Sequence, residues 1–212
     1  MTVELRFRQR DLILLEALAQ RVRLIGQRQA AEAFWRGHLA NTRRRLNQLA
    51  TAGMVTRSIV NAQPLPELTE PVVRWQPGQP HPDPNRIAFQ LQNRWRFRAL
   101  RPTVVYFPTS RTIAQFGGRE RSQALLTQVT HDLGVTAVWL RYAQQDSAMT
   151  AMWVGEDILA PTRVDQKLPD AALVDQHGEP KLLIEFGGSY GAARIADFHD
   201  DAAARGLPYH LW

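Results

Sequence analysis

The apolar positions of the first fifty residues recur at helical spacing. From residue 8 to residue 24, leucine, alanine and valine return every three or four positions, with arginine and glutamine between them. This spacing predicts an amphipathic helix that ends before Gly26. A second helix is predicted for residues 27–35 and a third for residues 43–52. Three short helices in this order favour a helix-turn-helix.

Cap and turn residues bound the third helix and lead into a predicted β-ribbon. Asn41 or Thr42 is expected to cap this helix, and Gly53 supplies a left-handed stop. Residues 54–60 then alternate enough to form a strand, and residues 72–75 are expected to return as its partner. Helices and ribbon together predict a winged helix-turn-helix over residues 1–75.

Prolines separate the two halves of the chain. Residues 64–84 hold seven of the thirteen prolines, and proline lacks the N–H that a helix interior or a central strand requires. This segment is therefore predicted to be an irregular arm. Residues 86–101 fit a helix or a strand nearly equally well, and either one aligns a basic stripe that includes Arg94 and Arg98.

Strand-like and helix-like patterns alternate in the C-terminal half. Strands are predicted at residues 103–107, 151–154, 171–174, 181–186 and 209–212, and helices at residues 110–116, 120–133 and 192–204. Residues 135–140 either continue the long helix or begin a strand. This order predicts an α/β sandwich around a small mixed sheet over residues 102–212, joined to the first domain by a linker and basic helix over residues 76–101.

Charge is unevenly distributed along the chain, whose formal net charge is +6. Residues 1–101 hold seventeen arginines against seven acidic residues, whereas residues 102–212 hold nine basic against thirteen acidic residues. Of the 26 basic residues, 24 are arginine, whose planar guanidinium matches phosphate and guanine. The basic half is therefore expected to bind double-stranded DNA.

Composition excludes several classes of protein. The chain has no cysteine, so neither a disulfide framework nor a thiolate metal site can form. No segment reaches 18 uninterrupted apolar residues, and the first residues lack the pattern of a signal peptide. These features predict a cytoplasmic protein without a membrane partner. A homodimer and a protein partner both remain open.

The third predicted helix carries side chains suited to reading DNA. Arg44, Arg45 and Gln48 lie on the face opposite its apolar residues; arginine pairs with guanine, and glutamine with adenine, in the major groove. The residues expected to contact DNA are Arg43, Arg44, Arg45, Gln48, Arg57, Arg94 and Arg98. The alternative is that these arginines form only a solvated polar face, or cover apolar surface with their stems.

Two acidic residues near the C terminus are the main candidates for chemistry. If the hairpin turn centres between His177 and Gly178, Asp170 lies opposite Glu185, with Cβ atoms about 4.5–5.5 Å apart. Opposed like charges destabilise a hairpin unless a cation relieves them. Asp170 and Glu185 are therefore predicted to bind Mg²⁺ or Mn²⁺, with Glu156 as the best third acid. The alternative is a surface hairpin whose acids face water.

Pro169-Asp170 on one hairpin strand and Glu185 on the next resemble the PD-(D/E)XK nuclease superfamily. More widely, the chain resembles bacterial replication-relaxation proteins of plasmids and mobile elements. The matching segments are residues 46–57, 130–135, 168–170 and 184–187, together with Trp153 before an acidic pair. The resemblance implies a winged helix joined to a nuclease-like domain, and a role in DNA processing, replication control or mobilisation.

One position departs from the nuclease pattern. The superfamily has a lysine two residues after the strand glutamate, where it orients the attacking water, but here Gly187 stands in that place. The predicted catalytic residues are Asp170, Glu185 and, as a substitute base, Lys167, with Lys181 and Arg194 as other candidates.

These features predict a DNA-binding protein of mobile-element or plasmid type in which metal-dependent DNA cleavage is slow or absent. The alternative is a regulator of transcription or replication without catalysis, in which the nuclease-like domain binds another protein.

Overall fold

The computed structural model describes residues 5–119, 128–162 and 167–212 and has a mixed α/β fold. The chain forms two compact units. Unit 1 consists of residues 1–63 and 100–136, and unit 2 consists of residues 64–99 and 137–212. Within the described ranges, no helix combines the length and the apolar character needed to cross a membrane.

These units do not coincide with the boundaries predicted at residues 75 and 101. The proline-rich segment and the helix after it belong to unit 2, while the strand that begins at Arg101 belongs to unit 1. The prediction treated residues 76–101 as a linker between consecutive domains. A long insertion between two paired strands adds little closure entropy, however, so strands that pair need not be close in sequence.

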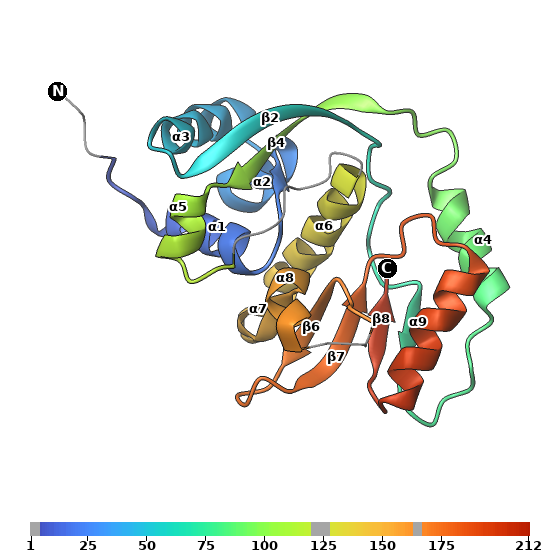
Figure 1. The fold of residues 1–212 in the computed structure, drawn as a ribbon. Helices are drawn as coiled ribbons and strands as arrows, with labels where there is room; N and C mark the ends of the chain where they lie inside the picture. Colours follow the sequence, from blue (N-terminus) through green and yellow to red (C-terminus); the bar gives the residue numbers. More distant parts are fainter. Residues whose placement is uncertain (1–4, 120–127, 163–166) are drawn as a thin grey trace. The chain divides into compact units, whose positions relative to one another are not determined.

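Unit 1 packs helices against a small sheet (Figure 1). Its elements are α1 (Gln9–Gln20), β1 (Ile25–Gly26), α2 (Gln27–Trp35), α3 (Leu39–Thr51), β2 (Val55–Ala62), β4 (Arg101–Pro108) and α5 (Ser110–Gln115). The strand order is β1-β4-β2. Leu15 and Leu18 of α1 and Leu46 and Leu49 of α3 are fully buried, so these predicted apolar positions lie in the core of this unit. Leu12, predicted on the same face of α1, is 36% exposed.

Helix α3 begins earlier than predicted. The predicted cap at Asn41 or Thr42 is wrong, because the helix begins at Leu39 with His38 as its N-cap residue. Thr42 is buried, and its hydroxyl donates a hydrogen bond to the His38 carbonyl at 2.9 Å. Gly37, with a φ of 79°, lies in the tight turn between α2 and α3, and residues 36–38 form the connection, as expected.

The predicted wing pairing of residues 54–60 with residues 72–75 is wrong. Strand β2 pairs antiparallel with β4, from Val55 opposite Pro108 to Ala62 opposite Arg101. The expected partner is instead β3 (Val73–Trp75), which pairs with β8 (Tyr209–Leu211) in unit 2. Residues 63–100 therefore leave the ribbon at the end of β2 and return at the start of β4.

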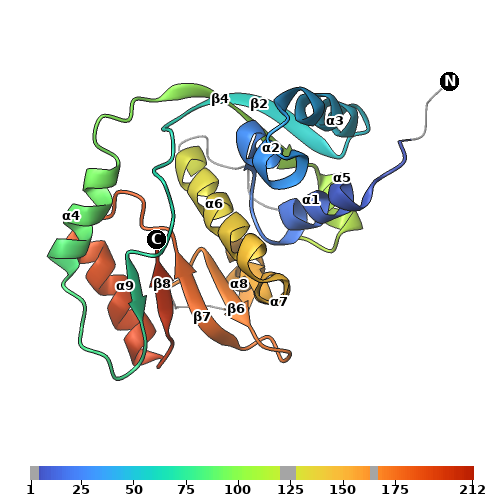
Figure 2. The same cartoon turned by 180° about the vertical axis from the view of Figure 1, so that it is seen from behind.

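Unit 2 contains the predicted mixed sheet, in the order β3-β8-β7-β6-β5 (Figure 2). Its further strands are β5 (Trp153–Gly155), β6 (Ala171–Val174) and β7 (Pro180–Glu185). Its helices include α4 (Pro84–Arg94), α7 (Ser147–Met152), α8 (Glu156–Leu159), the short 3₁₀ helix η2 (Ala160–Thr162) and α9 (Ala192–Ala204). Strands β7 and β8 run parallel, while the other neighbours run antiparallel.

Helix α6 (Val129–Gln145) begins in unit 1 and continues into unit 2. Residues 135–140 therefore continue the helix rather than begin a strand. The predicted start of this helix, residues 120–127, lies outside the described residues. Asp132, within the segment that matched the family pattern, is buried in unit 1 with its carboxylate 3.8 Å from the Arg23 guanidinium.

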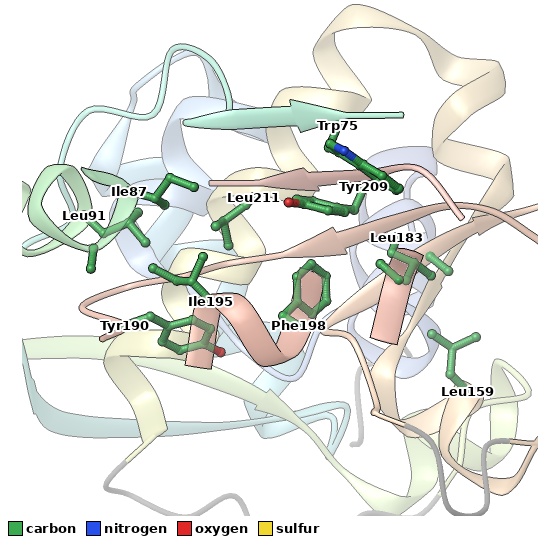
Figure 3. Packing of buried hydrophobic residues seen from close by; sticks show 13 residues of the cluster. Trp75, Ile87, Leu91, Leu159, Leu183, Tyr190, Ile195, Phe198, Tyr209 and Leu211 are labelled. Carbon is green, nitrogen blue, oxygen red and sulfur yellow. The ribbon is translucent and has the colours of Figure 1, made fainter. Parts of the chain in front are cut away.

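Side chains cover both faces of the unit 2 sheet. On one face, α4 and α9 pack an apolar cluster onto the strands (Figure 3). Its members include Trp75, Ile87, Leu91, Leu183, Ile195, Phe198, Tyr209 and Leu211. His210 lies between two members of this cluster, so strand alternation directs it to the other face, where Tyr142 of α6 donates or accepts a 2.6 Å hydrogen bond with its Nδ1. Unit 2 is thus a mixed sheet with helices packed on it, but the predicted strand 103–107 and helix 110–116 belong to unit 1, and β3 completes the unit 2 sheet instead.

Burial of His210 makes stability depend on pH. Burial, and secondarily the charge of Arg74, lowers the pKa of His210 from 6.5 to about 4. In the unfolded chain the ring binds a proton as pH falls through 6.5, whereas the folded chain binds it only near pH 4. The stabilisation that the neutral ring provides is therefore complete above pH 6.5, the pKa of the unfolded chain. It is lost as the pH falls from 6.5 to about 4.

We expect the His210→Gln variant to lose less stability on acidification than the wild type. The difference in unfolding free energy between about pH 7 and about pH 4.5 should be about 1–2 kcal/mol smaller, after allowance for solvent screening of a partly exposed ring. Urea unfolding at the two pH values measures it. Equal losses in both proteins would assign the pH dependence to other groups, and His177→Gln, at the exposed turn, is the control.

Candidate functional site

The β6–β7 hairpin brings Asp170 and Glu185 to opposite positions. The strands pair Ala171 with Ile184 and Ala172 with Leu183, and one further step in the same register sets Asp170 opposite Glu185. A bulge after Leu173 shifts the register only toward the turn. The structure therefore brings together the two carboxylates that the spacing predicted.

Backbone N–H groups hold both carboxylates in place. The Phe186 N–H donates to Asp170 Oδ2 at 2.7 Å, and the Asp170 N–H donates to Glu185 Oε2 at 3.1 Å. Asp170 is 9% exposed and Glu185 is 5% exposed. The alternative interpretation, in which both acids face water, is therefore wrong. Both carboxylates are buried at the ends of two inner strands of the sheet.

A tyrosine and an arginine adjoin this pair, and sequence reasoning missed the tyrosine. The Tyr190 hydroxyl donates to Glu185 Oε1 at 2.7 Å. Burial raises the pKa of Tyr190 strongly, and the charges of Glu185 and Asp170 raise it further. The Arg194 guanidinium lies 3.8 Å from the centre of the Tyr190 ring. Nothing in the local spacing marks Tyr190, because a loop folds it back onto the strand it follows.

Glu156, the candidate third acid, adjoins Asp170 through the backbone. Strand β5 pairs Gly155 with Ala171, and the Glu156 N–H donates to the Asp170 carbonyl at 2.9 Å. Glu156, Asp170 and Glu185 thus occupy adjacent positions across three neighbouring chain segments. Carboxylate oxygens are the ligands that hard divalent cations such as Mg²⁺ and Mn²⁺ prefer, but within the described residues these three side chains are not a group whose ligand atoms all lie within 4.8 Å of one another.

Leu91 of helix α4 fills the place next to Gly187. A Cβ atom at Gly187 would lie 2.6 Å from Leu91 Cδ1 and 3.1 Å from Leu211 Cδ1. A lysine stem cannot enter this space unless Leu91 moves, because real Cβ atoms do not approach so closely. The packing of α4 on the end of β7 therefore leaves no room for a lysine side chain at this position while Leu91 keeps its place.

The three cations considered as substitutes lie in different places. The Lys167 ammonium lies 2.8 Å from the Asp197 carboxylate, and the Lys181 ammonium lies 3.0 Å from that of Asp175 near the turn. Arg194 contacts Tyr190, which is itself bonded to Glu185. Of these three side chains, Arg194 is thus the one linked to the carboxylate pair through a described contact.

In unit 1, four of the residues predicted to contact DNA are exposed. Arg43, Arg44 and Gln48 project from α3, and Arg57 projects from β2. Burial raises the pKa of Tyr106, while the charges of Arg57 and Arg43 oppose that shift. Both arginines therefore act electrostatically on the same phenol, one from α3 and the other from β2.

Arg45 has a different environment from its neighbours. Its Nη2 lies 2.6 Å from Oδ2 of Asp11, which is fully buried, and its Nε donates to the same carboxylate at 3.1 Å. Its Nη1 donates to Gln48 Oε1 at 2.9 Å. The guanidinium thus ties α3 to α1, a role that a count of charges on the predicted helix does not reveal.

Arg94 and Arg98, the remaining predicted DNA contacts, belong to unit 2. Arg98 donates to the Arg94 carbonyl at 2.7 Å and to the Leu65 carbonyl at 3.1 Å. Burial lowers the pKa of Arg94, while the charge of Glu70 opposes the shift. The predicted basic stripe is therefore partly used to hold the chain after β2 against the end of α4.

No family model, curated protein or solved structure matches the chain. Its function must therefore be inferred from the chemistry of its own residues. Two arrangements stand out in this respect. One is the exposed arginine surface of α3 and β2, and the other is the buried carboxylate pair of the β6–β7 hairpin.

Proposed function

We propose that the protein binds duplex DNA through unit 1, with α3 in the major groove and the β2–β4 ribbon beside the phosphate backbone. The observation that carries the proposal is the exposure of Arg43, Arg44 and Gln48 on α3 next to Arg57 on β2. Arginine and glutamine at these positions can read base edges as well as contact phosphates.

The order of elements in unit 1 supports this geometry. Helix α2, the short turn at Gly37 and helix α3 have the order of a helix-turn-helix, and β2, which pairs with β4 in an antiparallel ribbon, follows α3 as a wing would. Strand β1 joins the same sheet through β4. This arrangement agrees with the winged-helix resemblance of residues 46–57, although the second wing strand comes from far along the chain.

Charge also favours unit 1 as the DNA-binding part. Unit 1 contains fifteen basic and six acidic residues, whereas unit 2 contains eleven basic and fourteen acidic residues. A surplus of cations releases counterions from DNA and provides sequence-independent affinity. Unit 2, which is acidic overall, would not contribute this attraction.

For unit 2 we propose a nuclease-like domain that binds Mg²⁺ or Mn²⁺ but cleaves DNA slowly or not at all. The order α6, β5, β6, β7, α9, β8, with Asp170 and Glu185 on the hairpin, supports the nuclease resemblance. The packing of Leu91 against Gly187 and the burial of both carboxylates favour the non-catalytic form, because a phosphate must reach the metal for hydrolysis.

The function that we infer is thus that of a DNA-binding regulator of replication or transcription, of the kind that plasmids and mobile elements encode. Metal-dependent DNA cleavage is the second candidate, and Arg194, which contacts Tyr190, rather than Lys167 would be the cation linked to its carboxylates. A cleavage assay of the full chain with supercoiled plasmid and Mn²⁺ separates the two, since the regulator converts none of the plasmid to the nicked form.

Replacing both Arg43 and Arg57 by alanine is expected to weaken duplex binding by the full chain about 30-fold or more, since each lost guanidinium contact accounts for about 1–3 kcal/mol. Fluorescence anisotropy with a labelled duplex measures the change. The matched control removes two exposed arginines of unit 2, Arg86 and Arg96. If the control loses as much affinity as the Arg43 and Arg57 variant, unit 1 does not carry the binding surface.

The carboxylate pair predicts a response to divalent metal. Mg²⁺ or Mn²⁺ should raise the melting temperature of the wild type by linkage, whereas Asp170→Asn should abolish the rise, because one of the two charged ligands is lost. Thermal unfolding and titration calorimetry measure both effects, with Asp175→Asn at the turn as control. If metal produces neither a heat of binding nor a rise in melting temperature in the wild type, Asp170 and Glu185 have a structural role only.

A further inference from the structure

Two histidines and an aspartate from distant parts of unit 2 meet beside the sheet. His81 belongs to the proline-rich segment after β3, while His199 and Asp200 belong to α9. The two imidazole rings have centres 4.0 Å apart, and His81 Nε2 lies 3.5 Å from Asp200 Oδ1. One ligand atom from each of the three side chains lies within 4.8 Å of the other two.

Hydrogen bonds fix how both rings present their nitrogens. His81 Nδ1 lies 2.8 Å from the Pro82 carbonyl oxygen, and since a carbonyl only accepts, Nδ1 carries the hydrogen and Nε2 of the neutral ring keeps a lone pair. His199 Nδ1 lies 3.2 Å from the Tyr209 hydroxyl, which leaves its Nε2 for another partner. Histidines that bind metal usually engage their second nitrogen in this way.

The surroundings give the cluster one rigid ligand and two adaptable ones. His199 is 5% exposed and packs edge-on against the Trp75 ring, with centroids 4.8 Å apart. His81 and Asp200 have side chains that are 51% and 71% exposed. Two ligand atoms bound to one ion at about 2.1 Å lie at most about 4.2 Å apart. The two exposed side chains therefore need only a small inward movement around the fixed His199.

The contact between His81 and Asp200 requires a positive charge. A lone pair on His81 Nε2 and a carboxylate oxygen of Asp200 are both acceptors, and at 3.5 Å they repel unless a proton or a cation lies between them. Two imidazole nitrogens and one carboxylate form a donor set typical of Zn²⁺ and related transition metals, unlike the all-oxygen set that Mg²⁺ prefers.

We propose that His81, His199 and Asp200 bind a transition-metal ion of the Zn²⁺ class, with water completing the coordination. The ion attaches the proline-rich segment to α9 next to the edge strand β3. This segment has few backbone hydrogen bonds of its own, since proline donates none, so a metal bridge stabilises it where the backbone does not. The proposal is independent of DNA binding and of the Asp170–Glu185 pair.

The test uses the full chain without an affinity tag. Titration with Co²⁺, followed by its visible absorption, and calorimetry with Zn²⁺ should show one ion bound per chain when excess Mg²⁺ occupies the Asp170–Glu185 pair. His81→Ala and Asp200→Asn should each weaken Zn²⁺ binding at least tenfold. Both replaced side chains are exposed, so these variants should fold. His177→Ala, at the exposed turn, should bind Zn²⁺ as the wild type does.

Thermal unfolding provides the second readout. With Zn²⁺ at about one hundred times its dissociation constant, the melting temperature of the wild type should rise by about 5–10 °C, while that of His81→Ala should not change. A wild type that binds neither ion would overturn the proposal and leave a protonated His81 paired with Asp200. Unchanged Zn²⁺ affinity in both His81→Ala and Asp200→Asn would overturn it equally, because the bound ion would lie elsewhere.

Discussion

Replacing Asp11 by alanine is expected to lower the free energy of unfolding by about 3–5 kcal/mol. Asp11 is fully buried, and its carboxylate accepts hydrogen bonds from the Arg45 guanidinium and from the Arg8 N–H. Without the carboxylate, the charged guanidinium of Arg45 loses its partner in a region shielded from water. The Arg45→Ala variant leaves the complementary defect, a buried carboxylate without its cation, and should lose a similar amount.

Urea unfolding of both single variants and of the double variant tests this ion pair. Breaking one side of a buried pair costs more than removing both partners, so the Asp11→Leu/Arg45→Met variant should be more stable than either alanine variant. Losses that simply add would show that the two side chains do not act together. Arg45 is therefore a poor residue for testing DNA contacts, because its loss also disturbs the packing of α3 on α1.

The packing of Leu91 on Gly187 gives the second large effect. We expect Gly187→Ala to destabilise the protein by about 1–3 kcal/mol through overpacking, because the new methyl group would meet Leu91 at 2.6 Å. Leu91→Ala removes a side chain that is 1% exposed and should cost about 2–5 kcal/mol. In the double variant the new methyl group enters the space that Leu91 leaves, so the combined loss should be smaller than the sum.

A double-mutant cycle of unfolding free energies measures this coupling. The control exchanges Gly191 for alanine, a position where an added Cβ atom has no neighbour within 4 Å. If Gly187→Ala is as stable as the wild type, α4 does not close the position next to Glu185. The space for a catalytic lysine side chain would then be available, and the packing of α4 would not exclude cleavage.

Local patterns predicted the parts of the fold that depend on neighbouring residues. Helix α2 has the predicted bounds, residues 27–35, because apolar spacing and the following turn determine it. Gly53, with a φ of 71°, ends α3 as expected. The register that sets Asp170 opposite Glu185 is the predicted one, but the turn itself pairs Val174 with Pro180, and a bulge after Leu173 shifts the strands into this register.

Local patterns did not predict the contacts between residues that are distant in the sequence. Strand β2 pairs with β4 rather than with the nearer strand-like residues 72–75, because only the folded core selects between two suitable strands. The burial of Arg45 against Asp11, and of Gly187 against Leu91, depends on helix packing in the same way. Tyr190 reached the carboxylate pair through a loop whose path the sequence does not indicate.

The salt dependence of duplex binding tests the proposed DNA surface most directly. Each phosphate contact contributes about 0.9 to the slope of log affinity against log salt concentration. If Arg43 and Arg57 contact phosphates, replacing both by alanine should reduce the slope of the full chain by about 1.8. An unchanged slope, with affinity equal to that of the wild type across the salt range, would contradict the assignment of DNA binding to α3 and β2.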